Sequence, residues 1–243
     1  PEAAIHFLPG ATQANFIVHA AALSPIQSVI CPDSGHVYAH EAGSIENTGH
    51  KLVPLPSTDG KISAEQIREV AASYYNSGEP NYICEPKMVY ISFPTEWGTI
   101  YSEQELREIR KVCNEYGMYL FADGARLGYG LGSVKNDLTL EKLAELTDVF
   151  YIGGTKCGAL FGEALVITNK KLARKFRTYM KQNGAVMAKG WLLGMQFCSL
   201  LEDGTYEKMT AQADAYALEI KVAFKEKGIR EYVESYTNQL FVV

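Results

Sequence analysis

The sequence predicts an α/β fold in which helices cover both faces of a mostly parallel sheet. Four nearly continuous apolar segments have the length of strands that are buried on both faces. They are residues 88–93, 119–122, 149–152 and 164–168. Amphipathic segments of helical period lie at residues 64–75, 103–116 and 140–146, with Ser102 as the expected N-cap of the second. Strands that alternate with helices in this way favour a doubly covered parallel sheet.

The C-terminal third of the chain has a different pattern. Residues 170–227 are predicted to be almost wholly helical, with breaks at Asn183-Gly184 and Asp203-Gly204. Residues 229–243 are expected to begin a smaller α+β portion, and their apolar end is expected to be a strand. We therefore expect a large domain over residues 1–200, then a connecting helix and the start of a small, truncated C-terminal domain over residues 201–243.

Composition excludes several classes of protein. A net charge of −5 argues against a nucleic-acid binder, which normally carries a basic face. No apolar segment approaches the roughly 18 to 20 residues of a membrane span, and no signal peptide opens the chain. The five cysteines form no CxxC pair, so neither a disulfide framework nor a metal site is expected. Reduced thiols in a cytoplasmic protein are the simplest interpretation.

Lys156 is the first candidate for chemistry. It follows the predicted strand 149–152 and stands between glycines, at the sheet edge where ligands collect in α/β proteins. A lysine in a confined pocket loses hydration, which lowers its pKa and favours the neutral amine that Schiff-base formation requires. A surface lysine on a turn is the ordinary alternative.

Asp123 strengthens this interpretation. It follows the predicted strand 119–122, although Asp-Gly is also a common turn dipeptide. A carboxylate at the end of one strand and a lysine at the end of the next strand but one match the needs of pyridoxal phosphate (PLP). The acid keeps the pyridine nitrogen protonated, so that the ring can act as an electron sink.

A phosphate site and a ring-stacking residue complete the set. Residues 8–15 carry small side chains and stand directly before an apolar helix at 16–23. The free N–H groups at the start of such a helix can hold an anion. An ordinary capped helix start explains the same residues equally. No Walker or GxGxxG motif is present, which makes a nucleotide-binding module improbable. His36 lies on a polar loop from which an imidazole can stack on a flat ring. The other loop histidines are expected to be satisfied surface residues: His6, His19 and His50.

Taken together, these segments resemble the low-specificity threonine aldolases, within the aromatic β-eliminating lyase group of fold-type-I PLP enzymes. The resemblance rests on residues 10–15, on His36-x-Tyr-x-x-Glu41-Ala-Gly, on Asp123-Gly-Ala-Arg126 and on Gly-Thr-Lys156. It extends from residue 7 to residue 242 and implies a fold-type-I PLP-dependent, aminotransferase-like large domain.

The resemblance implies a role for each residue of these motifs. Lys156 is similar to the lysine that forms the Schiff base, and Asp123 to the partner of the pyridine nitrogen. His36 resembles the imidazole that stacks on the ring and limits the orientation of the substrate's β-hydroxyl. Arg126 matches an arginine near the cofactor's 3-oxygen and the substrate carboxylate. Glu41 stands where the family usually has an acid, hydrogen-bonded within the active-site loop.

Two further features follow from the resemblance. The backbone of Ala11 and Thr12, together with the Thr155 hydroxyl, corresponds to the phosphate cradle. Many family members carry a histidine near the substrate where this chain has Glu96. The general base is therefore open among Glu96, His36 and a phosphate-bound water.

The expected activity is that of a PLP-dependent carbon–carbon lyase. It cleaves threonine or another β-hydroxy-α-amino acid to glycine and an aldehyde, in a homodimer or homotetramer with shared active sites. Neither nucleic acid nor membrane is an expected partner. The alternatives are a different PLP-dependent lyase acting by β-elimination, a racemase on the same scaffold, or a catalytically silent scaffold protein.

Overall fold

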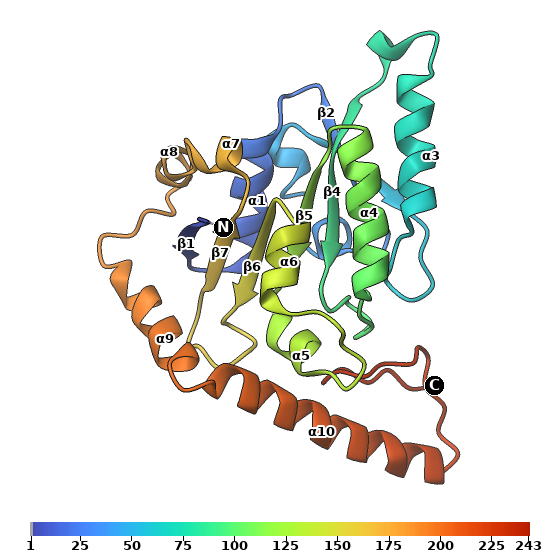
Figure 1. The fold of residues 1–243 in the computed structure, drawn as a ribbon, viewed down its shortest axis with the longest axis vertical. Helices are drawn as coiled ribbons and strands as arrows, with labels where there is room; N and C mark the ends of the chain where they lie inside the picture. The colour runs from blue at the N-terminus through green and yellow to red at the C-terminus, as the bar shows by residue number, and fades with distance from the viewer. Residues whose placement is uncertain (1) are drawn as a thin grey trace.

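The apolar segments predicted as strands lie side by side in one seven-stranded sheet of order β1-β7-β6-β5-β4-β2-β3 (Figure 1). The computed structural model describes residues 2–243. Its strands are β1 (Ala4–Leu8), β2 (Gln27–Pro32), β3 (Lys51–Leu55), β4 (Glu85–Ser92), β5 (Tyr119–Asp123), β6 (Val149–Gly153) and β7 (Glu163–Ile167). The strands β3, β2, β4, β5 and β6 pair in parallel, whereas β7 is antiparallel to both of its neighbours. The prediction of a mostly parallel sheet is confirmed.

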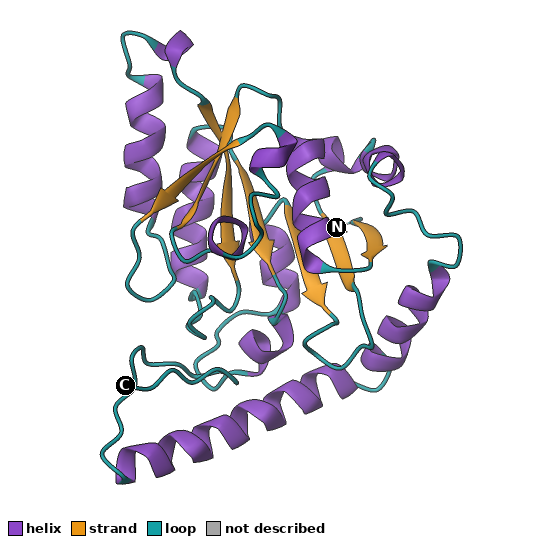
Figure 2. Ribbon diagram, turned by 180° about the vertical axis from the view of Figure 1, so that it is seen from behind, coloured by secondary structure: helices purple, strands orange, loops and turns teal. Residues whose placement is uncertain are grey.

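Helices flank the sheet on both sides, as predicted (Figure 2). They are α1 (Ala11–Ala22), α2 (His36–Ala39), α3 (Ala64–Tyr75), α4 (Glu103–Glu115), α5 (Leu127–Gly132), α6 (Leu140–Leu146), α7 (Lys170–Ala173), α8 (Phe176–Gln182), α9 (Trp191–Leu201) and α10 (Thr205–Glu226), with short 3₁₀ turns η1 (Glu46–Thr48) and η2 (Pro80–Tyr82). Ser102 caps α4 as expected, in a reciprocal capping box with Glu105. The predicted breaks fall after α8 and between α9 and α10, where Gly184 and Gly204 adopt positive φ.

Successive side chains of the central strands pack alternately into two separate hydrophobic cores. On β4, Val89 and Ile91 join a core with α3, α4 and α6, whereas Met88 and Tyr90 join a core with α1 and α8. All four are fully buried. This alternation on a strand without an exposed face explains why its sequence is almost continuously apolar.

The carboxylate and the lysine are closer in the fold than the sequence suggested. β5 and β6 are hydrogen-bonded neighbours, so the prediction that Lys156 follows the next strand but one after Asp123 was wrong. The reason is that no strand is inserted between the two segments along the sheet. Their carboxyl ends therefore meet directly at the edge where the site lies.

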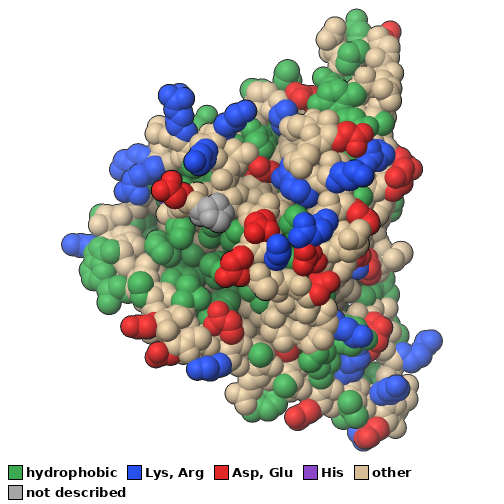
Figure 3. All heavy atoms as spheres, in the orientation of Figure 1, with side chains coloured by type: hydrophobic (Ala, Val, Ile, Leu, Met, Phe, Trp, Pro, Cys, Tyr) green, Lys and Arg blue, Asp and Glu red, His purple; other side chains and the backbone are tan. Residues whose placement is uncertain are grey.

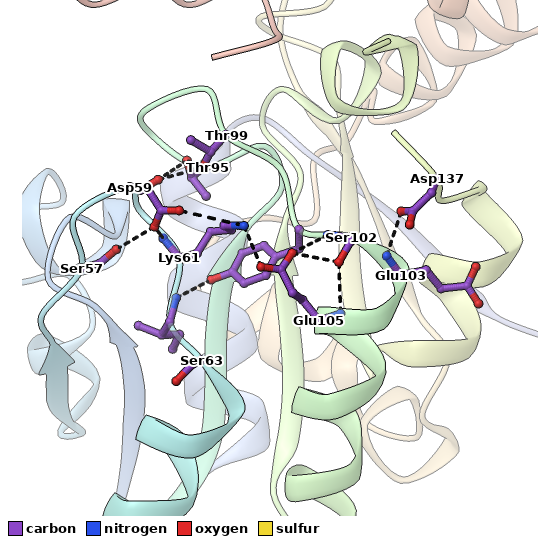
Figure 4. Close-up of polar contacts among 12 residues, drawn as sticks. Ser57, Asp59, Lys61, Ser63, Thr95, Thr99, Ser102, Glu103, Glu105 and Asp137 are labelled. Atoms are coloured by element: carbon purple, nitrogen blue, oxygen red, sulfur yellow. Dashed lines mark hydrogen bonds and ion pairs between the residues drawn. The ribbon is translucent and has the colours of Figure 1, made fainter. Parts of the chain in front are cut away.

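A polar cluster anchors the loop between β4 and α4 (Figure 4). The Asp59 carbonyl oxygen accepts hydrogen bonds from the hydroxyls of Thr95, at 3.3 Å, and Thr99, at 2.7 Å. Nearby, Lys61 forms an ion pair with Glu105 at 2.7 Å. Because this loop leaves the end of a central strand, the cluster fixes backbone that borders the sheet edge.

The C-terminal segment departs from the prediction. Residues 229–243 contain an isolated bridge between Glu231 and Val242 rather than the expected strand. Their apolar side chains instead pack on an aromatic one, since the ring of Phe241 lies 5.0 Å from that of Trp97. This segment follows α10, which runs along the edge at which β4 and β6 end and packs on α5 (Figure 1).

A second hollow lies between α9 and the β1-β7-β6 side of the sheet. Figure 3 shows hydrophobic side chains gathered there. Its volume is about 510 Å³, and its walls include Phe7, Val166, Phe197 and Leu201. Of the helices in residues 2–243, none combines the length and the apolar character needed to cross a membrane.

Candidate active site

The polar residues that follow the central strands line one cavity of about 480 Å³. His36 comes from the segment after β2, Glu96 from the loop after β4, Arg126 from the turn after β5 and Lys156 from the turn after β6. A small recess beneath the cavity is bordered by the same four residues and by Asp123. The structure thus brings together residues that lie up to 120 positions apart in the sequence.

Asp123 ends β5 and is held by three donors. The backbone N–H of Ala125 donates to Oδ1 at 3.0 Å, while the Tyr90 hydroxyl, at 2.5 Å, and Asn15 Nδ2, at 3.3 Å, donate to Oδ2. Burial raises the pKa of Tyr90 well above its ordinary value, and the Asp123 charge adds to this effect. The tyrosine therefore stays a donor, and the buried carboxylate is satisfied.

The glycine after Asp123 is required by the sheet itself. A Cβ atom at Gly124 would lie 1.8 Å from the Tyr151 carbonyl oxygen. No side chain fits there, so Asp-Gly at this place permits the close approach of β5 to β6. The following Arg126 is the N-cap residue of α5 and borders both the cavity and the recess.

A tight turn presents Lys156. The N–H groups of Gly154 and Thr155 both donate to the Gly162 carbonyl oxygen at 3.1 Å, and Gly162 N–H donates back to Thr155 Oγ1 at 2.9 Å. The Tyr129 hydroxyl donates to the Lys156 carbonyl oxygen at 2.7 Å. None of these contacts involves the Lys156 side chain.

The Lys156 amine has an electrostatic setting suited to a nucleophile. Partial burial lowers its pKa, and the nearby Arg126 charge lowers it further, against the opposing effects of Asp123, Glu163 and Glu96. Within residues 2–243 the amine forms no ion pair. Lys156 is more exposed than the sequence predicted, because it lies on the turn between β6 and β7.

The N-terminus of α1 has no side-chain cap and lies at the recess. Gly10 stands at the N-cap without a side-chain hydrogen bond, and no atom lies within 4 Å of where its Cβ would be. The first N–H groups of a helix, here those of Ala11 and Thr12, have no partner within the helix. Ala11 also borders the recess. The Thr155 oxygen accepts from Gly162 within its own turn, which leaves only its hydroxyl hydrogen to donate.

His36 is paired with a buried carboxylate. Its Nδ1 lies 2.8 Å from Glu41 Oε1, and this hydrogen bond raises the pKa of His36 more than burial lowers it. Glu41 is buried and also accepts from Asn15 at 2.6 Å and from Ser44 at 2.7 Å. The interaction of Glu41 within this loop, implied by the resemblance, is present.

Glu96 is engaged through one oxygen only. Its Oε1 accepts from the backbone N–H of His36 at 2.8 Å and from the Ser92 hydroxyl at 2.6 Å. Its Oε2 is buried without a partner among the residues described. Burial raises the pKa of Glu96, and the Asp123 charge raises it further. Such a carboxyl group can exchange a proton with a bound molecule.

Three histidines do not fit the expectation of surface residues. His19 and His50 are buried, and His6 is half-buried. Burial lowers the pKa of His19 to about 4, and its Nδ1 lies 2.6 Å from the Asn15 carbonyl oxygen one turn earlier. The reason is that His19 lies on the face of α1 that packs on the sheet.

Sequence reasoning missed four polar side chains that the fold gathers beneath the cavity: Asn15, Tyr90, Ser92 and Glu163. Asn15 follows Ala11 by one helical turn, and Tyr90 and Ser92 share one face of β4, so helical and strand periods carried a weak signal. Glu163 begins β7, is buried and accepts from Gly154 N–H at 2.9 Å. Burial is the main reason why its pKa rises to about 7.

A lysine, a carboxylate and an open helix terminus at the edge of this sheet define the class of fold-type-I PLP enzymes. The chain belongs to the beta-eliminating lyase family, whose model matches residues 1–243. This family depends on PLP. The fold is similar to that of a putative kynurenine aminotransferase of Saccharomyces cerevisiae, at 16% identity and a TM-score of 0.73 over 96% of this chain and 56% of that one.

Several proteins similar to this chain are threonine aldolases. A low-specificity L-threonine aldolase from a Pseudomonas species is 34% identical over 86% of this chain and 60% of that protein. One from Pseudomonas aeruginosa is 31% identical over 88% of this chain and 61% of that protein. A solved Leishmania major threonine aldolase is 47% identical, with a TM-score of 0.95, over 100% of this chain and 70% of that one. The chain thus spans about 60% of the length of the curated relatives.

The residues present fit PLP. The cofactor needs an amine for its aldehyde, a carboxylate for its pyridine nitrogen and a site for its phosphate. This chain offers the unpaired Lys156 amine, the buried Asp123 carboxylate at the recess and the uncapped N–H groups at Ala11 and Thr12. All three border one connected space at the carboxyl ends of the strands.

Proposed function

We propose that the full protein is a PLP-dependent lyase that cleaves threonine or another β-hydroxy-α-amino acid to glycine and an aldehyde. The observation that carries this proposal is the meeting of Lys156, Asp123 and the His36–Glu41 pair around one cavity. The names of the relatives, low-specificity L-threonine aldolases, support the substrate class.

Five groups of this chain would hold the cofactor. Lys156 would bond its aldehyde carbon, Asp123 would pair with its ring nitrogen, and His36 would stack on the ring. The phosphate would lie at the N–H groups of Ala11 and Thr12, with the Thr155 hydroxyl as a further donor. When bound, PLP supplies an electron sink for the bond cleavage.

Arg126 is proposed to bind the substrate carboxylate. It borders both the cavity and the recess, and its guanidinium forms no ion pair within residues 2–243. A planar guanidinium suits two-point binding of a carboxylate. Such a contact would fix the bond between the α and β carbons relative to the cavity wall.

Two side chains are placed to take the proton of the β-hydroxyl. When neutral His36 donates its Nδ1 hydrogen to Glu41, its Nε2 becomes an acceptor. Glu96 offers Oε2, which has no partner within the described chain. A water held at the phosphate is the third candidate. Replacing His36 and Glu96 one at a time distinguishes these three candidates. The variant that lacks the general base loses one limb of the pH profile, whereas both variants keep that limb if water is the base.

The reaction is tested by its products. Purified full-length protein is supplied with PLP and threonine, and glycine and acetaldehyde are quantified. We expect the two products in equal amounts, and no turnover in the Lys156→Ala variant. Release of ammonia and a 2-oxo acid in place of glycine contradicts the aldolase and indicates β-elimination, whereas inversion at the α-carbon alone indicates a racemase. An inactive protein that binds no PLP is the catalytically silent scaffold.

We also infer a homodimer or homotetramer. Lys156, which lines the cavity, is exposed, and large apolar side chains are exposed on α9, among them Trp191 and Met195. A second subunit would cover such surfaces. Light scattering on the purified protein measures the assembly, and a monomer at working concentrations contradicts it.

Two further proposals concern location and domains. A cytoplasmic location is supported by the five cysteines, which are all free within the described chain. Residues 1–200 are proposed as the PLP-binding domain, and residues 201–243 as a connecting helix that leads into a smaller domain. The 22-residue α10, which lies outside the layers of the sheet, supports this division.

A further inference from the structure

Asn15 is a buried polar side chain beneath the site for which the proposed reaction has no role. It lies on α1, one turn after Ala11, and is completely inaccessible to solvent. Residues four positions apart share one face of a helix. The helix that offers free N–H groups at its start therefore directs an amide to the same side, one turn further along.

The Asn15 amide joins two carboxylates. Its Nδ2 lies 2.6 Å from Glu41 Oε1 and 3.3 Å from Asp123 Oδ2. An amide nitrogen carries two hydrogens, which suffices for one hydrogen bond to each carboxylate. The opposite orientation would place an oxygen against both, so the carboxylates fix the orientation of the amide.

The orientation leaves the other end of the amide unsatisfied. Asn15 Oδ1 is buried and has no hydrogen-bond partner among the residues described. A side chain that served packing alone would be better replaced by an apolar one, since an unpaired buried acceptor is destabilising. The donor end of Asn15 is therefore the part that the site uses.

Each of the two carboxylates has its own partner at the cavity. Glu41 Oε1 also binds His36 Nδ1 at 2.8 Å, and Asp123 Oδ2 also accepts from the Tyr90 hydroxyl at 2.5 Å. The hydrogen-bonded series thus runs from the His36 imidazole through Glu41, Asn15 and Asp123 to Tyr90. It connects α2, α1, β5 and β4.

We propose that Asn15 is a positioning residue that links Glu41 to Asp123, so that the partner of the His36 imidazole and the partner of the cofactor's ring nitrogen are set as one unit. The assignment of those partners rests on the proposed function. The link itself is a property of the protein without cofactor.

The link has an electrostatic consequence. Glu41 and Asp123 both lie within reach of one nitrogen and are both buried. Without a donor between them, two close carboxylates do not both ionise readily, and one of them retains a proton to higher pH. The other titratable groups that face the pair are His36, His19, Tyr90, Tyr151, Glu96, Glu163 and Lys156. None of these groups occupies the place of the Asn15 amide.

The test is a difference infrared spectrum of the cofactor-free full-length protein, recorded across pH. The variants are Asn15→Leu, which removes both donors, and Asn15→Ser, whose single hydroxyl cannot span two carboxylates. We expect each variant to show, relative to the parent, the carbonyl stretch of one additional protonated carboxyl group. That signal should be lost as the pH is raised.

The matched control is Gln13→Leu, on the same turn of α1. Its amide donates to the Asn183 carbonyl oxygen at 3.2 Å, away from both carboxylates. This variant should show no additional carboxyl signal. In a Glu41→Gln background the signal of Asn15→Leu should disappear as well, because only one carboxylate remains.

Three results would overturn the link: no additional signal in either Asn15 variant, an equal signal in Gln13→Leu, or persistence of the signal with Glu41→Gln. If Asn15→Leu does not fold, Asn15→Ser decides the question alone. PLP affinity gives a second readout, with roughly tenfold weaker binding expected for Asn15→Leu.

The two proposals fail separately. If the parent protein binds no PLP while the infrared signal behaves as expected, the link holds and the proposed function fails. If threonine is cleaved to glycine and acetaldehyde and the signal is absent, the proposed function holds and the link fails.

Discussion

The two sides of the cavity are built in opposite ways. On one side, Asp123 is buried and held by donors from Tyr90, Asn15 and Ala125. On the other side, the hydrogen bonds around Lys156 go to its backbone, and its amine is unpaired within residues 2–243. The difference teaches that a group which must stay charged in one place is surrounded by donors, whereas a group which must bond and release a ligand is given a rigid backbone and a free side chain.

The largest effect is expected on the fixed side. Asp123→Asn keeps the shape of the side chain but removes the charge that holds a protonated ring nitrogen. We expect kcat to fall by roughly 10²- to 10³-fold, as for the loss of one preorganised electrostatic group. Steady-state kinetics measures this, with thermal melting as the control for folding. A variant with kcat close to that of the parent would show that the fixed side does not act on the cofactor.

The carboxyl group beneath the lysine turn gives the next effect, on stability. The pKa of Glu163 rises to about 7, chiefly because of burial. A folded pKa above the unfolded value stabilises the protein at pH below the unfolded pKa, and this contribution is lost as pH rises through about 7. The parent should therefore lose on the order of a few kcal/mol between about pH 5 and pH 8.5, and Glu163→Gln should not.

Melting temperatures of the two proteins across this range measure the difference. Parallel pH curves for parent and Glu163→Gln would show that Glu163 titrates normally. That result would contradict the burial of the Glu163 carboxyl group, which accepts a hydrogen bond from Gly154 N–H in the lysine turn.

A pair of tyrosines compares the two sides directly. Tyr90→Phe removes a donor to the buried Asp123 carboxylate, whereas Tyr129→Phe removes a donor to the Lys156 carbonyl oxygen. Hydrogen bonds to charged groups are worth about 1.5–3 kcal/mol and neutral ones about 1 kcal/mol. We expect roughly tenfold or greater loss of PLP affinity for the first variant and a few-fold loss at most for the second. Equal losses would remove the distinction between the sides.

The smallest effect concerns the pH profile. Glu41 raises the pKa of His36 through their hydrogen bond. If neutral His36 accepts the substrate proton, activity falls as pH drops through that pKa. In Glu41→Gln, the acid limb of kcat/KM should therefore move to lower pH by about one unit. An unmoved limb assigns proton transfer to Glu96 or to water.

The central sheet could be predicted because burial on both faces leaves a continuous apolar signal, as in β4, β5 and β6. The strands β1, β2 and β3 were missed because polar residues or proline interrupt their apolar pattern, for example Pro54 on the edge strand β3. The strand expected at the C-terminus was wrong, since Phe241 packs on the Trp97 ring in place of joining a sheet. An apolar run alone does not reveal its partner.

The residues of the site also divide into those that the sequence could predict and those that it could not. Asp123, Arg126 and Lys156 could be predicted because each follows an apolar strand, and strand ends share an edge. Asn15 and Tyr90 could not, because their partners lie 108 and 33 positions away and only the fold brings them together. A buried polar residue resembles its apolar neighbours in sequence until its partner is known.

The most direct test is reduction of the full-length protein with borohydride in the presence of PLP, followed by peptide mapping. The account predicts one pyridoxyl group per chain, attached to Lys156. It also predicts that Asp123→Asn, in which the lysine turn is intact, is labelled at the same residue. A label on another lysine, or no label in a protein that is folded, would contradict the assignment of Lys156 and with it the comparison of the two sides.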